Sequence, residues 1–176
     1  TKSLVDKIGG TIGVESKQGV GTTYTITLPF AIDHTEAAEP EQQQTDLAVL
    51  QGQRVLLAED NALNMEIMEF LLSDVGIKVT KATDGQQAVE AFAASPVGGF
   101  DAILMDLHMN GMDGFAAARA IRAHPVGHDV PIIALSAAAL QRDVAASQAA
   151  GMNAHLPKPI NALQLARALV QWIAPR

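Results

Sequence analysis

Three short segments of this 176-residue chain end in charged residues that could act together in one reaction. The charged residues that end these segments are Glu59 and Asp60, Asp106, and Lys158. If the segments are neighbouring parallel strands, their ends meet at one edge of a sheet. Three carboxylates and one ammonium group would then share a small crevice. Because carboxylates at close range repel each other unless a cation lies among them, chemistry explains this cluster better than stability does.

The residue types in this cluster favour phosphoryl chemistry assisted by magnesium. Oxygen ligands without histidine or cysteine suit Mg²⁺, and a carboxylate beside such an ion can attack a phosphoryl group. Phosphoryl transfer depends mainly on positioning and charge neutralisation. Lys158 could bind one phosphoryl oxygen, and Ser136, at the end of another expected strand, could hydrogen-bond a second.

The segments that must position this cluster alternate between strand and helix patterns over residues 53–174. The expected strands are 54–59, 77–82, 102–105, 131–135 and 154–156. The expected helices are 62–75 with Ile67, Phe70 and Leu71 on one side, one capped by Asp84 that ends near Pro96, 114–123, one that ends at Gly151, and 161–173 capped by Asn161. Five strands alternating with five helices predict a doubly wound α/β domain. Continuous apolar strands indicate a parallel sheet covered on both faces, which binds ligands at the carboxyl ends of its strands.

Two further segments precede this domain. Residues 1–30 predict the end of a helix stopped by Gly9 and Gly10, then strands at 11–16 and 22–28 with period-two alternation in the second. A lone hairpin with one helix is too small to be stable alone, so it is expected to belong to a larger sheet. Residues 31–52 are acidic and polar and predict an extended or disordered linker, in which residues 47–50 could dock locally.

The composition excludes several classes of function. The net charge of −7 and pI of about 5.1 argue against non-specific nucleic-acid binding, which needs a basic face. The absence of cysteine excludes disulfides and thiolate metal sites. We see no apolar run near the roughly 20 residues of a membrane span and no signal peptide, so a cytoplasmic location is expected. The chain starts at Thr1 without Met, which suggests a fragment.

Four motifs in residues 53–174 resemble the response regulator receiver domain, in order and at the spacing of that family. The motifs are Leu57–Asn61, Met105–Met109 with Met112–Gly114, Ala134–Ala137, and Lys158–Ile160. The resemblance implies a flavodoxin-like fold with five parallel strands in the order 2-1-3-4-5. It also implies Mg²⁺ as cofactor and a phosphohistidine as the phosphoryl source. Phosphorylation would switch the face built from the domain's fourth helix, fifth strand and fifth helix.

The resemblance also assigns roles to single residues. Asp106 would be the phosphoacceptor, Asp60 a direct Mg²⁺ ligand, and Glu59 a ligand that acts mostly through water. The backbone carbonyl of His108 would be the third protein contact to the metal. The remaining assignments are Ser136 as the switch hydroxyl and Lys158 as the partner first of Asp106 and then of the phosphoryl group, with a cis bond to Pro159.

Residues 1–30 resemble the end of a histidine-kinase ATP-binding domain. The residues that carry this resemblance are Gly9–Ser16, Gly19–Thr23 and Leu28–Phe30. A kinase end, a linker and a receiver in this order resemble a hybrid sensor histidine kinase. The nucleotide-binding boxes of that domain are absent, and none of the five histidines is followed by Glu. The fragment is therefore expected to catalyse only its own phosphorylation and dephosphorylation. Its partner would be a histidine-phosphotransfer domain or a kinase dimerisation and phosphoacceptor domain.

Three positions depart from the usual receiver pattern. His155 stands where Tyr or Phe is usual, and Asn110 stands where Pro is usual. His108, two residues after Asp106, is at a position that influences hydrolysis of the acyl phosphate in this family. Because histidine titrates near neutrality, we hypothesise that His155 makes the switch pH-sensitive and less dependent on aromatic burial.

Other functions fit the sequence less well. A magnesium-dependent phosphatase of the haloacid-dehalogenase type would need a second Asp two residues after the nucleophile, where this chain has His108. The intact acidic set argues against a domain that works by docking alone. A transcription factor is disfavoured, because three residues follow the last expected helix. An exposed edge of the hairpin in residues 1–30 could pair two copies of the chain into a homodimer.

Overall fold

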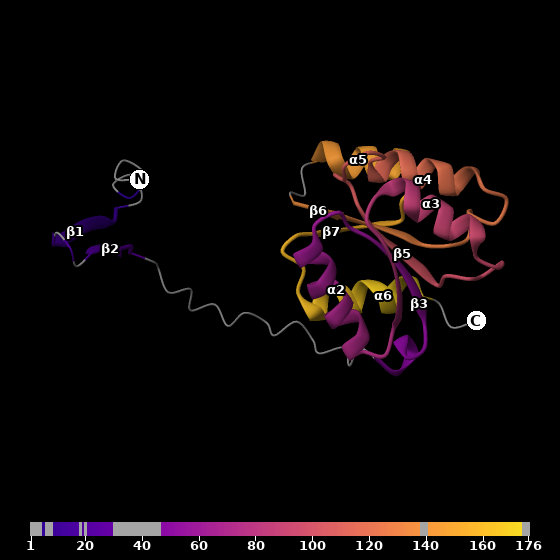
Figure 1. Ribbon diagram of the computed structural model, residues 1–176, viewed down its shortest axis with the longest axis horizontal. Helices are drawn as coiled ribbons and strands as arrows, with labels where there is room; N and C mark the ends of the chain where they lie inside the picture. The colour runs from indigo at the N-terminus through magenta and orange to yellow at the C-terminus, as the bar shows by residue number, and fades with distance from the viewer. Residues whose placement is uncertain are drawn as a thin grey trace. The chain divides into compact units, whose positions relative to one another are not determined.

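The computed structural model describes residues 5, 9–17, 19, 21–29, 47–137 and 141–173, with residues 141 and 142 described by their backbone alone. The chain divides into two compact units, Thr1–Gln43 and Gln44–Arg176 (Figure 1). Among the helices of the described part of the chain, none has the length and apolar character needed to cross a membrane.

The first unit contains a two-stranded antiparallel hairpin. Strand β1 is Thr11–Lys17 and strand β2 is Gly21–Thr27. Val14 pairs with Tyr24, and all the described side chains of β2 are exposed. The hairpin predicted for residues 11–28 is thus present, and its exposed apolar side chains suit the expectation of a larger sheet. Apart from Val5, the residues of the predicted preceding helix up to residue 8 lie outside the described residues.

The second unit is built on a sheet of five parallel strands. The strands are β3 Arg54–Ala58, β4 Lys78–Ala82, β5 Ala102–Asp106, β6 Ile132–Ser136 and β7 Ala154–Pro157. They lie in the order β4-β3-β5-β6-β7. Counted within this unit the order is 2-1-3-4-5, so both the doubly wound architecture and the strand order expected from the sequence are confirmed.

Helices cover both faces of this sheet. The helices are α2 Ala62–Asp74, α3 Gly85–Ala94, α4 Gly114–Ala123, α5 Gln141–Ala149 and α6 Ala162–Trp172. In Figure 1, α2 and α6 lie on one face and α3, α4 and α5 on the other. A 3-10 helix, η1 Leu47–Leu50, precedes β3, and Leu50 is fully buried in the core beside α2 and α6. The core of this unit therefore includes Leu50, which belongs to the segment predicted as a linker.

The alternation of side chains along the inner strands creates a core on each face of the sheet. Leu56 and Ile103 enter the core under α3 and α4, whereas Leu57 and Leu104 enter the core under α2 and α6. All four side chains are fully buried. Residues on both sides of these strands are apolar because both faces are covered by helices. The two cores fix β3 and β5 side by side, and with them the residues that follow these strands.

Helix caps and a glycine fix the loops at the carboxyl ends of the strands. Asn61 caps α2 by accepting hydrogen bonds from the backbone of Leu63 and Asn64. The predicted caps Asp84 and Asn161 accept bonds in the same way at α3 and α6. At the start of α4, a Cβ on Gly114 would overlap the carbonyl oxygen of Asp106. The glycine therefore allows α4 to start directly against the end of β5.

The buried side of α2 is not the one that Ile67 and Phe70 occupy. Met65, Met68 and Leu72 are buried against the sheet, whereas Phe70 is 70% exposed. The helix is apolar on both sides, so its hydrophobic pattern does not show which side faces the core.

We expect the variant Gly114→Ala to lower the free energy of unfolding by about 1–3 kcal/mol, because the added Cβ must push α4 away from the end of β5. Urea denaturation measures this change. The matched control is Arg119→Ala on the exposed side of the same helix, which should change stability by less than about 0.5 kcal/mol. Equal stability of Gly114→Ala and the wild type would contradict this packing.

Candidate functional site

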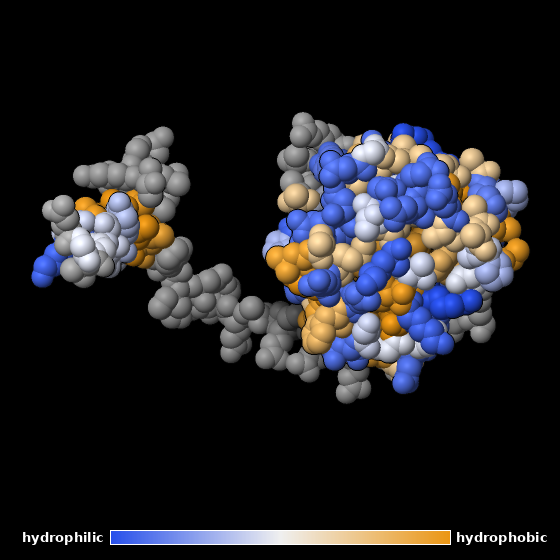
Figure 2. All heavy atoms as spheres, viewed as in Figure 1, coloured by the Kyte–Doolittle hydropathy of each residue, from blue (hydrophilic) through white to orange (hydrophobic). Residues whose placement is uncertain are grey.

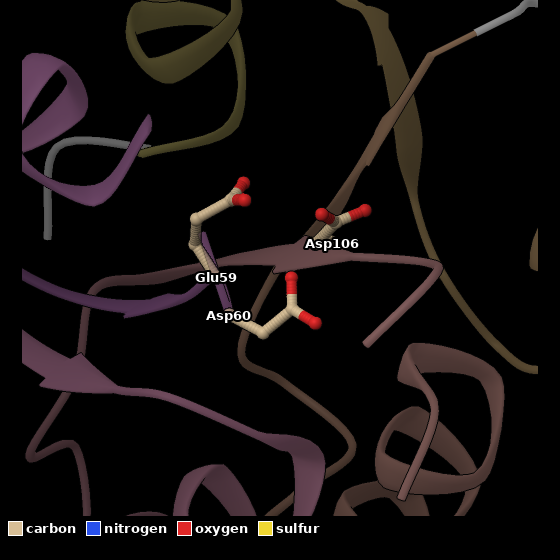
Figure 3. Close-up of side chains that lie close together, drawn as sticks. All are labelled: Glu59, Asp60 and Asp106. Atoms are coloured by element: carbon tan, nitrogen blue, oxygen red, sulfur yellow. The ribbon is translucent and has the colours of Figure 1, made fainter. Parts of the chain in front are cut away.

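The charged residues predicted to meet do meet at the carboxyl edge of the sheet. Glu59 and Asp60 follow β3, Asp106 ends the adjacent β5, and Lys158 follows β7. Carboxylate oxygens of the three acidic residues lie within 4.8 Å of one another. Figure 3 shows these side chains converging from the ends of two neighbouring strands. The crevice lies where the chain passes to opposite sides of β3, the position at which doubly wound sheets bind ligands.

Lys158 joins two of the three carboxylates. Its Nζ lies 2.5 Å from Oε2 of Glu59 and 2.6 Å from Oδ2 of Asp106. The side chains of Glu59 and Asp106 are 1% and 9% exposed, and that of Lys158 is 19% exposed. Burial lowers the pKa of Lys158, but hydrogen bonds and charges from Asp106 and Glu59 outweigh burial and raise its pKa overall. Lys158 is thus held as a cation between two carboxylates.

Both oxygens of Glu59 are bound by protein groups. Oε1 accepts hydrogen bonds from Nδ2 of Asn64 at 3.0 Å and from the backbone nitrogen of Asn61 at 3.3 Å. Oε2 accepts from Lys158. Asn64 was not predicted as part of the site, since one helical Asn carries no distinctive sequence signal. This arrangement is compatible with the prediction that Glu59 contacts a metal through water.

Asp60 is held by Asn110, one of the three residues that depart from the usual receiver pattern. Oδ2 of Asp60 accepts hydrogen bonds from the backbone nitrogen of Asn110 at 3.1 Å and from its Nδ2 at 2.8 Å. Proline at position 110 would supply neither donor. In Figure 3 one oxygen of Asp60 points toward Asp106 and the other points away. Asn110 therefore holds the orientation of a carboxylate at the mouth of the crevice.

Asp106 lies between Lys158 and the backbone that follows β5. Its Oδ2 accepts from Lys158, and its Oδ1 accepts from the backbone nitrogen of His108 at 3.2 Å. The ring of His108 is exposed and contacts Phe115 edge-on, with centroids 6.3 Å apart. The structure therefore places the backbone of His108 beside Asp106, whereas its imidazole packs on α4.

Ser136 and His155 form a hydrogen-bonded pair next to this cluster. Oγ of Ser136 and Nε2 of His155 are 2.6 Å apart, and the backbone nitrogen of Lys158 donates to the carbonyl of Ser136 at 2.7 Å. The peptide bond between Lys158 and Pro159 is cis, as the resemblance implies. Burial lowers the pKa of His155, and the charge of Asp143 in α5 opposes this shift in part.

One cavity among the described residues of the second unit adjoins the charged cluster. It measures about 240 Å³ and is lined by Glu59, Asn64, Ile67, Met68, Lys158, Pro159 and Ile160. Another cavity, of about 390 Å³, lies among the loops that lead into β5 and β6, and none of the predicted site residues lines it. The cavity of about 240 Å³ is therefore the one that adjoins the predicted site, and both charged and apolar side chains line it.

We expect the free energy of unfolding of the wild type, compared with that of the variant His155→Phe, to decrease as the pH falls from about 7 to about 5. The folded-state pKa of His155 lies below its ordinary value of 6.5, so the unfolded chain takes up the proton first. The stabilisation is complete above pH 6.5 and is lost as the pH falls toward the folded-state pKa. Urea denaturation of both proteins across this range measures the difference, and a pH-independent difference would contradict it.

Comparisons with known proteins identify the family of the second unit. The family model described as "Response regulator receiver domain" matches residues 55–170. The chain is 37% identical over 171 residues to the sensor histidine kinase AruS of Pseudomonas aeruginosa, covering 96% of this chain and 16% of that protein. The chain thus spans about a sixth of the length of this relative.

Solved structures share the fold of the second unit. The receiver domain of sensor histidine kinase PA1611 from Pseudomonas aeruginosa, with magnesium coordinated in its active-site cleft, is 45% identical with a TM-score of 0.65, covering 69% of this chain and 98% of that one. The receiver domain of Ssk1 from Saccharomyces cerevisiae, in complex with the histidine phosphotransfer protein Ypd1, is 29% identical with a TM-score of 0.62. This match covers 70% of this chain and 90% of that one. The chain belongs to the response regulator receiver domain family of two-component signalling, in the form found in hybrid sensor histidine kinases.

Proposed function

We propose that Asp106 accepts a phosphoryl group from a phosphohistidine and that Lys158 and Ser136 bind the transferred group. The observation that carries this proposal is the position of Asp106, with one oxygen held by Lys158 at 2.6 Å amid the acidic cluster. The ammonium group is close enough to move its interaction from the carboxylate to a phosphoryl oxygen. A residue with a merely structural ion pair would not need the second and third carboxylates beside it.

In this reaction a carboxylate oxygen of Asp106 attacks phosphorus and forms an acyl phosphate. The phosphorus–nitrogen bond to the donor histidine breaks, and its electron pair returns to the imidazole. Lys158 stabilises the negative charge on the phosphoryl oxygens, and the hydroxyl of Ser136 donates a hydrogen bond to another of them. These groups work by positioning and by neutralising charge, which is what phosphoryl transfer requires of a protein.

The donor set fits Mg²⁺. Glu59, Asp60 and Asp106 offer oxygens alone, and their three negative charges against the one positive charge of Lys158 leave the site with two charges to neutralise. Hard divalent cations prefer such ligands. We propose Asp60 and Asp106 as direct ligands, with the backbone carbonyl of His108, and Glu59 as a contact through water. When bound, Mg²⁺ would neutralise charge on the phosphoryl oxygens and draw the donor into the crevice.

An exposed apolar stripe on α2 provides a docking face for the phosphohistidine partner. Leu63, Ile67 and Phe70 project from this helix, and Ile67 also lines the cavity beside the charged cluster. Figure 2 shows hydrophobic surface over the region where Figure 1 draws α2. Apolar side chains clustered beside an active site are typical of a protein interface. We propose a histidine-phosphotransfer domain, or the phosphoacceptor domain of a kinase, as the partner.

The consequence of phosphorylation would be a change in the face formed by α5, β7 and α6. Ser136 and His155 connect the crevice to β7, and β7 lies between these helices in the sequence. Added negative charge at Asp106 would draw Ser136 and Lys158 toward it and bias this face between two arrangements. We further propose that residues 1–30 are the end of an ATP-binding domain and that the 176-residue chain is cytoplasmic. The only reactions that we propose for this chain are its own phosphorylation and dephosphorylation.

Phosphotransfer from a labelled phosphohistidine domain tests the proposed reaction. The wild type should become labelled in the presence of Mg²⁺, and both EDTA and the variant Asp106→Asn should abolish labelling. The control variant is Glu90→Gln on the exposed side of α3, on the other face of the sheet from α2 (Figure 1), which should be labelled at the wild-type rate. Labelling of Asp106→Asn at the wild-type rate would exclude Asp106 as the acceptor.

The docking face has a separate test. Phe70→Glu should slow transfer from the phosphohistidine domain by about tenfold or more, because an apolar anchor is replaced by a charge. The same variant should react normally with acetyl phosphate, a donor too small to use α2. Val97→Glu is the matched control, since Val97 is 81% exposed and lies in the loop before β5, and it should leave both rates unchanged. An unchanged transfer rate in Phe70→Glu would place the partner elsewhere.

A further inference from the structure

The hydrogen bond between Ser136 and His155 joins two neighbouring strands at the edge of the site. Ser136 is the last residue of β6, and His155 lies within β7, opposite Ala134 in the parallel register. The two side chains meet at 2.6 Å, and Lys158, three residues after His155, donates its backbone N–H to the carbonyl of Ser136. His155 is thereby coupled to the residue proposed to bind a phosphoryl oxygen.

The surroundings of the His155 ring favour one tautomer. Nδ1 is buried and has no hydrogen-bond partner within the described ranges of the chain, whereas Nε2 contacts Oγ of Ser136. A neutral imidazole carries one N–H. If the proton were on Nδ1, a buried donor would be left unpaired, and orphaned buried N–H groups are rare because they are costly. With the proton on Nε2, the ring donates to Ser136.

The charge state of the ring is consistent with this assignment. Burial lowers the pKa of His155, and Asp143 is the charged residue that acts on it in the opposite direction. The ring is therefore neutral at pH 7, with one proton to place. An imidazolium would have an N–H on both nitrogens, so it would leave Nδ1–H buried and unpaired.

We propose that His155 is a positioning residue whose Nε2–H donates to Ser136 Oγ, so that the proton of the serine hydroxyl is directed toward a phosphoryl oxygen on Asp106. This inference rests on the proposed function of Asp106. A hydroxyl that accepts a hydrogen bond on its oxygen is polarised and donates its own proton more strongly. Its rotation is also restricted before the phosphoryl group arrives, which reduces the entropy lost on binding.

Histidine in place of the usual aromatic residue gives Ser136 a hydrogen-bond donor. Phenylalanine at position 155 would fill similar space but offers no N–H, so Ser136 would lose the donor on its oxygen. The bond between His155 and Ser136 is therefore specific to chains with an imidazole at this position. It acts on the proposed phosphoryl site through Ser136, and His155 itself need not contact the phosphoryl group.

Nitrogen-15 NMR of the whole chain reports the tautomer directly. At pH 7 the His155 ring should carry its proton on Nε2, and the Nε2 resonance should shift in Ser136→Ala. A ring protonated on Nδ1 would overturn the proposal, because Ser136 would then be the donor and its proton would point to His155. This measurement needs neither metal nor phosphoryl group, so its outcome is independent of the proposed function.

A double-mutant cycle tests the effect on the phosphoryl site, with beryllium fluoride and Mg²⁺ as the probe. His155→Phe should weaken beryllium fluoride binding about five- to tenfold, the change carried by one ordinary hydrogen bond. In the Ser136→Ala background the same substitution should have no effect, because the residue through which His155 acts is gone. Equal weakening in both backgrounds would show a packing role and overturn the proposal. If the wild type failed to bind the probe, the proposed function itself would fall.

Discussion

The site depends most on the position of one ammonium group between two carboxylates. Lys158 contacts Glu59 and Asp106, which come from adjacent strands and would repel each other without a cation between them. Removing one partner from a buried ion pair typically costs about 3–5 kcal/mol, because the remaining charge is left uncompensated. The three strand ends are therefore linked electrostatically as well as by the sheet, and the same contact keeps a cation next to the proposed acceptor.

The parallel sheet makes this contact possible at little conformational cost. β3 and β5 are adjacent, so the residues that follow them leave the sheet at the same edge. The backbone around Asp106 is fixed by the close approach of α4 at Gly114, and the orientation of Asp60 is fixed by Asn110. Rigid elements thus hold the groups that we propose act on the phosphoryl group, whereas the exposed face of α2 is the proposed docking face for a larger partner. Proposed chemistry and proposed recognition meet at the cavity beside Glu59.

The sequence was informative where a pattern repeats and uninformative where a contact depends on distant single residues. Alternating apolar segments predicted the five strands, and the motifs predicted their order and the meeting of Glu59, Asp60, Asp106 and Lys158. The bond from Asn110 to Asp60 joins residues 50 positions apart, and no periodicity signals it. The buried side of α2 was equally hidden, since this helix carries apolar residues on both sides. The pairing of His155 with Ser136 also needed the strand register, although the unusual histidine had marked the position.

The central claim is that the crevice at the carboxyl edge of the sheet makes Asp106, among its three carboxylates, the phosphoryl acceptor. Reduction of the phosphorylated chain with borohydride tests this most directly, because it converts an aspartyl phosphate into homoserine that peptide mass spectrometry can locate. We expect homoserine at position 106, with Asp60 and Glu59 unmodified. Homoserine at position 60, or a phosphoryl group recovered on a histidine such as His108, would contradict it.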